Sequence, residues 1–187
     1  MRGALTLLFA LGVLGGGRTV RAEMPRRTST ITFYGWSNDS RWVAYTRFRG
    51  GRQRPDEPMH RLVEGGTFRG FGEHVGGDVA AYAARRGYVL RTMAKEVLDP
   101  SRIRFRDGPL ELVVTFEVGK AIGWRLSRDG VELARHAFDR PYLAFDVDAF
   151  PSPDGRQAVL VMALDTGWEV DAAAFPVPLG KAETRAP

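Results

Sequence analysis

The histidines of this sequence, His60, His74 and His136, are the first residues that could do chemistry. Glu73-His74 and Asp78 lie close together in a glycine-rich stretch, where they could form a metal or acid–base site on a loop. No His-x-x-x-His or cysteine spacing accompanies them, so the sequence predicts no metal site and no cofactor. His74 stays a candidate binding residue, with a solvated loop as the alternative, and His136 is expected on the surface of a strand.

Acidic residues form two further groups. Asp146, Asp148 and Asp154 could supply oxygen ligands for calcium, but Phe150-Pro151 breaks the register of a calcium-binding loop. The simpler interpretation places alternate aspartates on the solvent face of a strand.

The second acidic group is Asp165, Glu169 and Asp171, around Gly167-Trp168. A glycosidase needs two such acids at a defined separation in a cleft, which spacing along a chain does not show. A periplasmic hydrolase or metal-dependent enzyme that uses these acids, or His74 and its neighbours, is therefore an alternative hypothesis.

Other catalytic signatures are missing from the sequence. Ser37 and Ser152 lie outside any Gly-x-Ser-x-Gly pattern, and no Gly-Lys-(Ser/Thr) follows the glycines of residues 65–77. The chain has no cysteine, which excludes disulfides, thiolate ligands and a cysteine nucleophile. We therefore favour a protein that is not an enzyme.

A short pattern occurs twice and organises the chain. Each copy is a Ser-x-Asp turn, then an arginine, then an apolar run, because serine and aspartate side chains can bond backbone amides a few residues on. Apolar residues on both faces of the following segment predict a strand buried on both sides. The residues of the two copies are Ser37, Asp39 and Arg41, and then Ser152, Asp154, Gly155 and Arg156.

The second copy, Ser-Pro-Asp-Gly-Arg-Gln-Ala-Val-Leu, resembles the blade signature of TolB-type β-propellers. The first copy departs from it, with Asn38 in place of proline and Ser40 in place of glycine. The chain is more similar to small secreted bacterial proteins of unknown function that carry one or two such motifs. This resemblance implies a secreted β-rich protein, with a protein partner and no known activity.

Tryptophans are the remaining candidates for binding. Trp36, Trp124 and Trp168 each follow a glycine, which can let another ring or backbone approach closely. Exposed rings could stack on sugars or on a partner protein, so a carbohydrate-binding module is a second alternative. Packing in the core is the competing interpretation, since each tryptophan lies on or beside an apolar strand.

The elements that must position these residues are mostly strands. Two-residue periodicity predicts four successive strands between Leu110 and Val147, and apolar runs predict strands over 31–36, 42–48, 158–164 and, as a short edge strand, 173–177. Apolar residues at helical spacing predict one amphipathic helix over about 78–98, interrupted or ended at Gly87. The fold class is therefore mainly β (α+β), with antiparallel meander sheets that are sandwich-like or a partial propeller.

Residues 1–22 read as a signal peptide, cut before Glu23 or after Gly17. They carry three arginines and no acid, so removing them lowers the net charge from +5 to +2, too little to indicate nucleic acid. A single β-rich domain is expected over 23–180, with no transmembrane helix, and a disordered tail over 181–187. We expect a secreted or periplasmic, non-catalytic module that binds an envelope protein or a polysaccharide.

Overall fold

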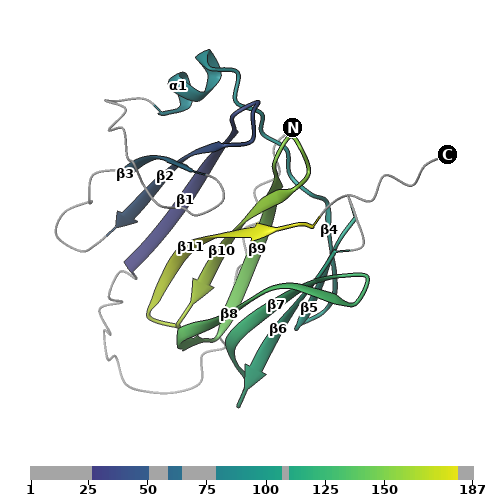
Figure 1. Ribbon diagram of the computed structural model, residues 1–187. Coiled ribbons are helices and arrows are strands. Elements are labelled where there is room, and N and C mark those ends of the chain that lie inside the picture. The colour runs from purple at the N-terminus through teal and green to yellow at the C-terminus, as the bar shows by residue number, and fades with distance from the viewer. Residues whose placement is uncertain (1–26, 51–58, 65–78, 107–109, 181–187) are drawn as a thin grey trace, which may run out of the picture.

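The computed structural model describes residues 27–50, 59–64, 79–106 and 110–180, which form two β-sheets and one short helix (Figure 1). The mainly-β class with one helix, expected from the sequence, is confirmed. The first sheet has the strand order β3-β2-β1-β11-β10-β9, and the second has the order β4-β5-β6-β7-β8. The elements are β1 (Arg27–Trp36), β2 (Trp42–Gly50), β3 (Met59–Glu64), α1 (Val79–Arg85), β4 (Lys95–Asp99), β5 (Arg102–Phe105), β6 (Leu110–Glu117), β7 (Lys120–Arg128), β8 (Val131–Tyr142), β9 (Ala144–Pro151), β10 (Gln157–Asp165) and β11 (Glu169–Pro178).

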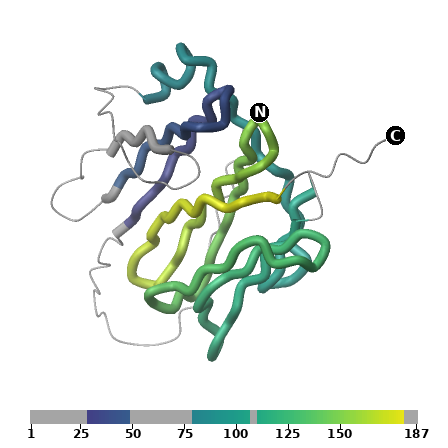
Figure 2. The backbone as a smooth tube through the Cα atoms, in the orientation of Figure 1, coloured from purple at the N-terminus to yellow at the C-terminus, as the bar shows by residue number. Residues whose placement is uncertain are grey.

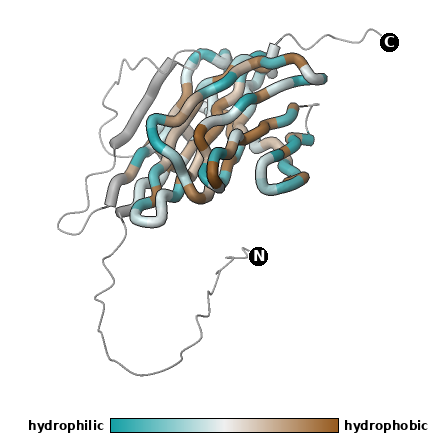
Figure 3. Tube along the Cα trace, turned by 90° about the horizontal axis from the view of Figure 1, so that it is seen from below, coloured by the Kyte–Doolittle hydropathy of each residue, from teal (hydrophilic) through white to brown (hydrophobic). Residues whose placement is uncertain are grey.

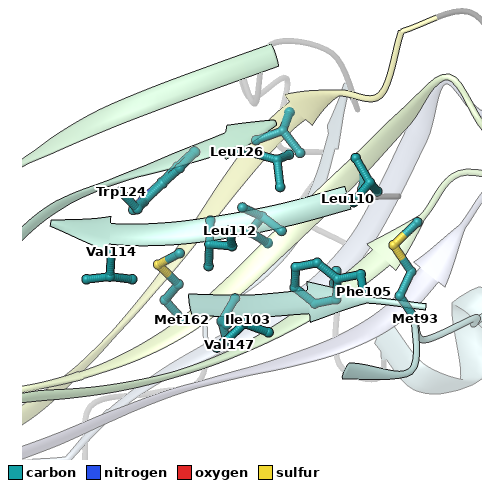
Figure 4. Close-up of a cluster of buried hydrophobic side chains, with 14 of the residues drawn as sticks. Met93, Ile103, Phe105, Leu110, Leu112, Val114, Trp124, Leu126, Val147 and Met162 are labelled. Atoms are coloured by element: carbon teal, nitrogen blue, oxygen red, sulfur yellow. The ribbon is translucent and has the colours of Figure 1, made fainter. Parts of the chain in front are cut away.

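Strand β10 lies at the centre of the packing, with buried side chains on both faces. Leu160 and Met162 point toward the second sheet, where they join the main core with residues such as Leu112 and Trp124 (Figure 4). Val159 points to the opposite side and packs with Phe33 and other side chains of β1 and β2. The absence of a polar face on β10 is what a strand enclosed on both sides requires.

The six-stranded sheet bends back on itself. Strands β1 and β11 pair in parallel only at Arg27 with Glu169 and at Thr28 with Val170. Further along, the ring of Phe33 stacks on Phe150 of β9, at 4.6 Å between centroids. The β1–β2 ribbon therefore covers the face of β9–β11 that points away from the second sheet. Figure 2 shows the same path as a continuous tube.

The sheet is built from two units of three strands. Strands β1, β2 and β3 form an antiparallel meander, and so do β9, β10 and β11. The parallel pairing of β1 with β11 means that both units run in the same direction and follow the same order across the sheet. Each unit begins with a hairpin whose turn is one copy of the Ser-x-Asp pattern.

The two turns share the same internal hydrogen bonds. Ser37 Oγ donates to Asp39 Oδ1 at 2.5 Å, and Ser152 Oγ donates to Asp154 Oδ1 at 2.6 Å. The backbone amides of Arg41 and Arg156 donate to the same two carboxylates, and each serine Oγ accepts from the first amide of the following strand, that of Trp42 or Gln157. Each turn therefore satisfies its own polar groups locally.

One residue joins the two turns to each other. Ser40 occupies the position that is Gly155 in the second copy, and both have positive φ, 59° and 68°. The Ser40 hydroxyl accepts a hydrogen bond from the backbone amide of Asp154, at 3.1 Å. The two turns therefore meet at one end of the molecule, at the top of Figure 1.

The predicted helix over 78–98 is too long. Helix α1 ends at Arg85, and Lys95–Asp99 forms strand β4 instead. Gly87, at φ 67°, ends the helix: its amide donates to the Ala84 carbonyl, and the Tyr88 amide donates to the Ala83 carbonyl. These two bonds form a Schellman motif, for which a glycine at positive φ is the usual residue. Apolar spacing beyond Gly87 reflects packing of an extended segment, not a helix.

Three other features differ from expectation. The last strand of the predicted meander, β9, crosses into the first sheet. Strand β11 lies between β1 and β10, not at an edge. Pro176 and Pro178 are compatible with this place because they lie beyond the two residues of β11 that pair with β1. Strands β3, β4 and β5 were not predicted, because β3 and β5 are short and β4 lies within the segment whose spacing predicted a helix.

No helix among the described residues is long and apolar enough to cross a bilayer.

Candidate functional site: an apolar end formed by three turns

Two of the three candidate tryptophans lie in the core. Trp36 is fully buried and donates from Nε1 to the carbonyl of Phe150, and Trp124 is almost fully buried against Phe175. The glycines before them allow a close approach: a Cβ at Gly35 would stand 2.7 Å from the carbonyl oxygen of Val89. A Cβ at Gly123 would stand 2.6 Å from the carbonyl oxygen of His136. Neither ring is available to stack on a ligand in this conformation.

Trp168 is different, because 85% of it is exposed to solvent. It lies in the turn between β10 and β11, and that turn is held by several hydrogen bonds. The amide and the hydroxyl of Thr166 donate to the Glu169 carbonyl, and the Glu169 amide donates to the Thr166 hydroxyl. The amide of Gly167 donates to Asp165 Oδ1 at 2.6 Å. The turn therefore holds the backbone of Trp168 in place while its indole ring stands in water.

Other exposed apolar side chains lie at the same end. We call Phe116, Val118, Leu143 and Trp168 the apolar end; they come from the β6–β7, β8–β9 and β10–β11 turns and the strand ends beside them (Figure 1). Leu143 approaches Gly167, where a Cβ would come within 2.9 Å of its Cδ1. Phe116 contacts the ring of Phe145, two residues after Leu143.

The apolar end holds four of the seven large hydrophobic side chains that stand exposed in the described part of the chain. Figure 3 looks at the molecule from the side of these turns and shows how hydrophilic and hydrophobic segments alternate along the chain. Grouped exposed apolar side chains are typical of surfaces that contact another molecule.

Val118 is both the most exposed of these residues and conformationally strained. It has φ 49° and Gly119 has φ 72°, so the β6–β7 hairpin turn needs positive φ at both positions. Such turns favour Asn-Gly or Asp-Gly, and a β-branched residue there is an outlier. The β7–β8 turn of the same sheet uses Asp129-Gly130, at φ 51° and 80°. Val118 therefore has a higher backbone energy cost than Asp129, which occupies the equivalent position in the neighbouring turn. Backbone strain of this kind is common at functional sites.

Two of the acids of residues 165–171, Glu169 and Asp171, form ion pairs with arginines, and the third, Asp165, accepts a hydrogen bond from the Gly167 amide. Arg140 of β8 contacts the carboxylate of Glu169 and approaches Asp171 at 3.9 Å, and Arg47 of β2 bonds Asp171 at 3.1 Å. The hydroxyl of Tyr142 and the carboxylate of Glu169 raise the pKa of Arg140 above its usual value. Because these ion pairs join β2, β11 and β8, the cluster ties the two sheets together beside Trp168.

Asp146 and Asp148 form ion pairs with the side chain of Lys95. Nζ of Lys95, on β4, donates to Asp146 at 2.7 Å and to Asp148 at 3.0 Å, which links the edge strands of the two sheets. Partial burial works to lower the pKa of Lys95, but these hydrogen bonds outweigh it and raise the pKa. In the described ranges, no three or more His, Cys, Asp or Glu side chains gather in a way that could hold a metal ion.

One histidine candidate, His136, lies among the described residues, and the other, His74, does not. His136 is exposed on β8, with its ring 4.6 Å from that of Phe175. Glu73, His74 and Asp78 lie outside the described residues, as do the predicted signal peptide and the tail over 181–187. The alternative loop site at His74 therefore stays a prediction.

These features define a class of protein: a mainly-β protein of two sheets and one short helix, with a group of exposed apolar side chains at one end. No protein-family model, curated protein or solved structure matches the chain.

Sequence reasoning missed two important members of the apolar end, Val118 and Leu143. Glu117 pairs with Lys120, so the residues of this hairpin turn are Val118 and Gly119. A valine before a glycine between two alternating strands was the available signal, because it occupies the position that asparagine or aspartate normally takes.

Proposed function

We propose that this protein is a non-catalytic, exported binding module, periplasmic or secreted, that attaches to a component of the cell envelope through its apolar end. The observation that carries the proposal is Trp168, exposed to 85% on a turn fixed by hydrogen bonds. A turn whose backbone is already fixed loses little backbone freedom when the large ring that it carries is covered, which favours binding.

The internal arrangement of the first sheet supports the resemblance to propeller blade motifs. Two turn-and-strand units follow each other in the same orientation, each with a Ser-x-Asp turn at the same place. We propose that they are two copies of a blade-like unit, used here in a small open sheet.

A photo-crosslinking amino acid at position 168, with a second variant that carries it at position 131, tests the proposed function. Val131 is also an exposed apolar residue, at 66%, but it lies beside the β7–β8 turn, away from the apolar end. We expect irradiation of an envelope fraction to give adducts from position 168 and few from position 131. Equal yields from the two positions, or adducts from neither, would contradict the proposal.

A further inference from the structure

We propose that the apolar end docks on the surface of a lipid bilayer, with Trp168 at the headgroup level and Val118 and Leu143 beneath it. This inference rests on the proposed function, since it names the envelope component that the same site binds.

The apolar end is small and divided among three turns. Its four side chains expose on the order of a few hundred Å² of apolar surface. A stable interface with a second copy or with a rigid protein covers about 800 Å² on each partner. A bilayer needs no complementary surface, because each side chain leaves water independently of the others. Apolar groups carried on separate turns therefore fit lipid better than they fit a flat protein partner.

The side-chain types also suit the boundary between headgroups and acyl chains. Tryptophan prefers that boundary because its ring is apolar while its indole N–H can still meet water. Val118 is exposed to 94% and Leu143 to 52%, so both can enter the acyl region without unfolding the turns that carry them.

Two acids beside the apolar end, Glu169 and Asp171, form ion pairs within the protein, and Asp165 accepts a hydrogen bond from the Gly167 amide. Glu169 is paired with Arg140, Asp171 is paired with Arg47, and Glu117 has Lys120 as its cross-strand neighbour. Approach to lipid therefore brings no large excess of one charge to the surface. We infer that docking depends on apolar contact, so neither anionic lipid nor low salt is needed.

The experiment is co-sedimentation of the mature chain, without the predicted signal peptide over 1–22, with vesicles of phosphatidylcholine alone or with added phosphatidylglycerol. It is done at low and high salt, with tryptophan emission recorded on the same samples. Trp168 is the tryptophan most exposed to solvent, whereas Trp36 and Trp124 are buried. A blue shift of the emission on vesicle addition, absent in Trp168→Ser, therefore reports entry of this ring into lipid. We expect binding at both salt concentrations, weakened about tenfold or more in Trp168→Ser.

Val118→Asn is the sharper variant, because asparagine suits the positive φ of this turn and should leave the fold at least as stable. We expect it to bind vesicles several-fold more weakly, while Val131→Asn, the same change away from the apolar end, binds as the unmodified protein does. Binding that appears only with anionic lipid and is lost at high salt would overturn the proposal. So would equal binding by the two asparagine variants.

Absence of vesicle binding, together with protein adducts from position 168 in the crosslinking experiment, would also overturn it. That combination would leave the proposed function standing, with a protein as the partner.

Discussion

At the scale of single residues, Ser40 shows how two distant parts of the chain depend on one hydroxyl group. The side chain is buried, its backbone has positive φ, and its Oγ accepts from the amide of Asp154. A glycine would suit the backbone better, so the serine is explained by the contact that it makes.

We therefore expect Ser40→Ala to lower the free energy of unfolding by about 1 kcal/mol, because the Asp154 amide loses an acceptor while the backbone cost stays. Ser40→Gly should cost less, since relief of positive φ offsets the lost hydrogen bond. Urea unfolding of both variants measures the difference. Gly155→Ala in the equivalent turn is the control: it should show the backbone cost alone, about 1 kcal/mol. An alanine variant at position 40 as stable as the unmodified protein would contradict this account.

At the scale of elements, the two Ser-x-Asp turns are units stabilised by an ionised carboxylate. Hydrogen bonds from Ser37 and from the Arg41 amide lower the pKa of Asp39. Burial works to raise the pKa of Asp154, but bonds from Ser152 and from the Arg156 amide outweigh it, so this pKa is also lowered. In the unfolded chain both groups should titrate near their ordinary value of 3.8.

A carboxyl group whose pKa is lower in the folded protein stabilises the fold at pH values above its pKa in the unfolded chain. This stabilisation is lost as the pH falls through the pKa of the folded state. We expect the urea concentration at the midpoint of unfolding to decrease when the pH is lowered below about 4. An Asp39→Asn, Asp154→Asn variant should be less stable at neutral pH and should lose less stability on acidification. Asp99 also has a lowered pKa and is left intact, so the comparison isolates the turns. Parallel pH profiles for the two proteins would refute this role of the carboxylates.

At the scale of the whole molecule, β10 belongs to two cores at once. Leu160 lies in the cluster shared with the second sheet, and Val159 lies in the cluster shared with β1 and β2. Because one strand supplies both, neither cluster can come apart without exposing a face of β10. The described residues should therefore unfold together.

We expect Leu160→Ala to lower the free energy of unfolding by about 2–5 kcal/mol, and Val159→Ala by about 2 kcal/mol. Both variants should still unfold in a single transition, measured by tryptophan emission and by circular dichroism. Ala163→Ser, an exposed position on the same strand, is the control and should change little. If the Val159 variant unfolds in two separate steps, β1–β2 forms an independent unit and the shared-strand argument is wrong.

Much of the fold could be predicted from local patterns. Alternation of apolar and polar residues located β6, β7, β8 and β9, and the paired Ser-x-Asp turns located β2 and β10. These patterns work because a strand has a period of two and a turn satisfies its polar groups within a few residues. Helix α1 was found but overextended, since apolar spacing alone does not separate a helix from a packed extended segment.

What the sequence by itself determined is therefore local: the strand class of most segments, the two turns and the absence of any cysteine chemistry. Only the tertiary structure decided that β9 leaves the meander for the other sheet and that Trp36 and Trp124 are enclosed while Trp168 is exposed. It also decided that the acids of residues 169–171 meet arginines from β2 and β8. The physical reason is that exposure and charge pairing depend on which segments pack together over long sequence separations, and a local pattern carries no information about that partner.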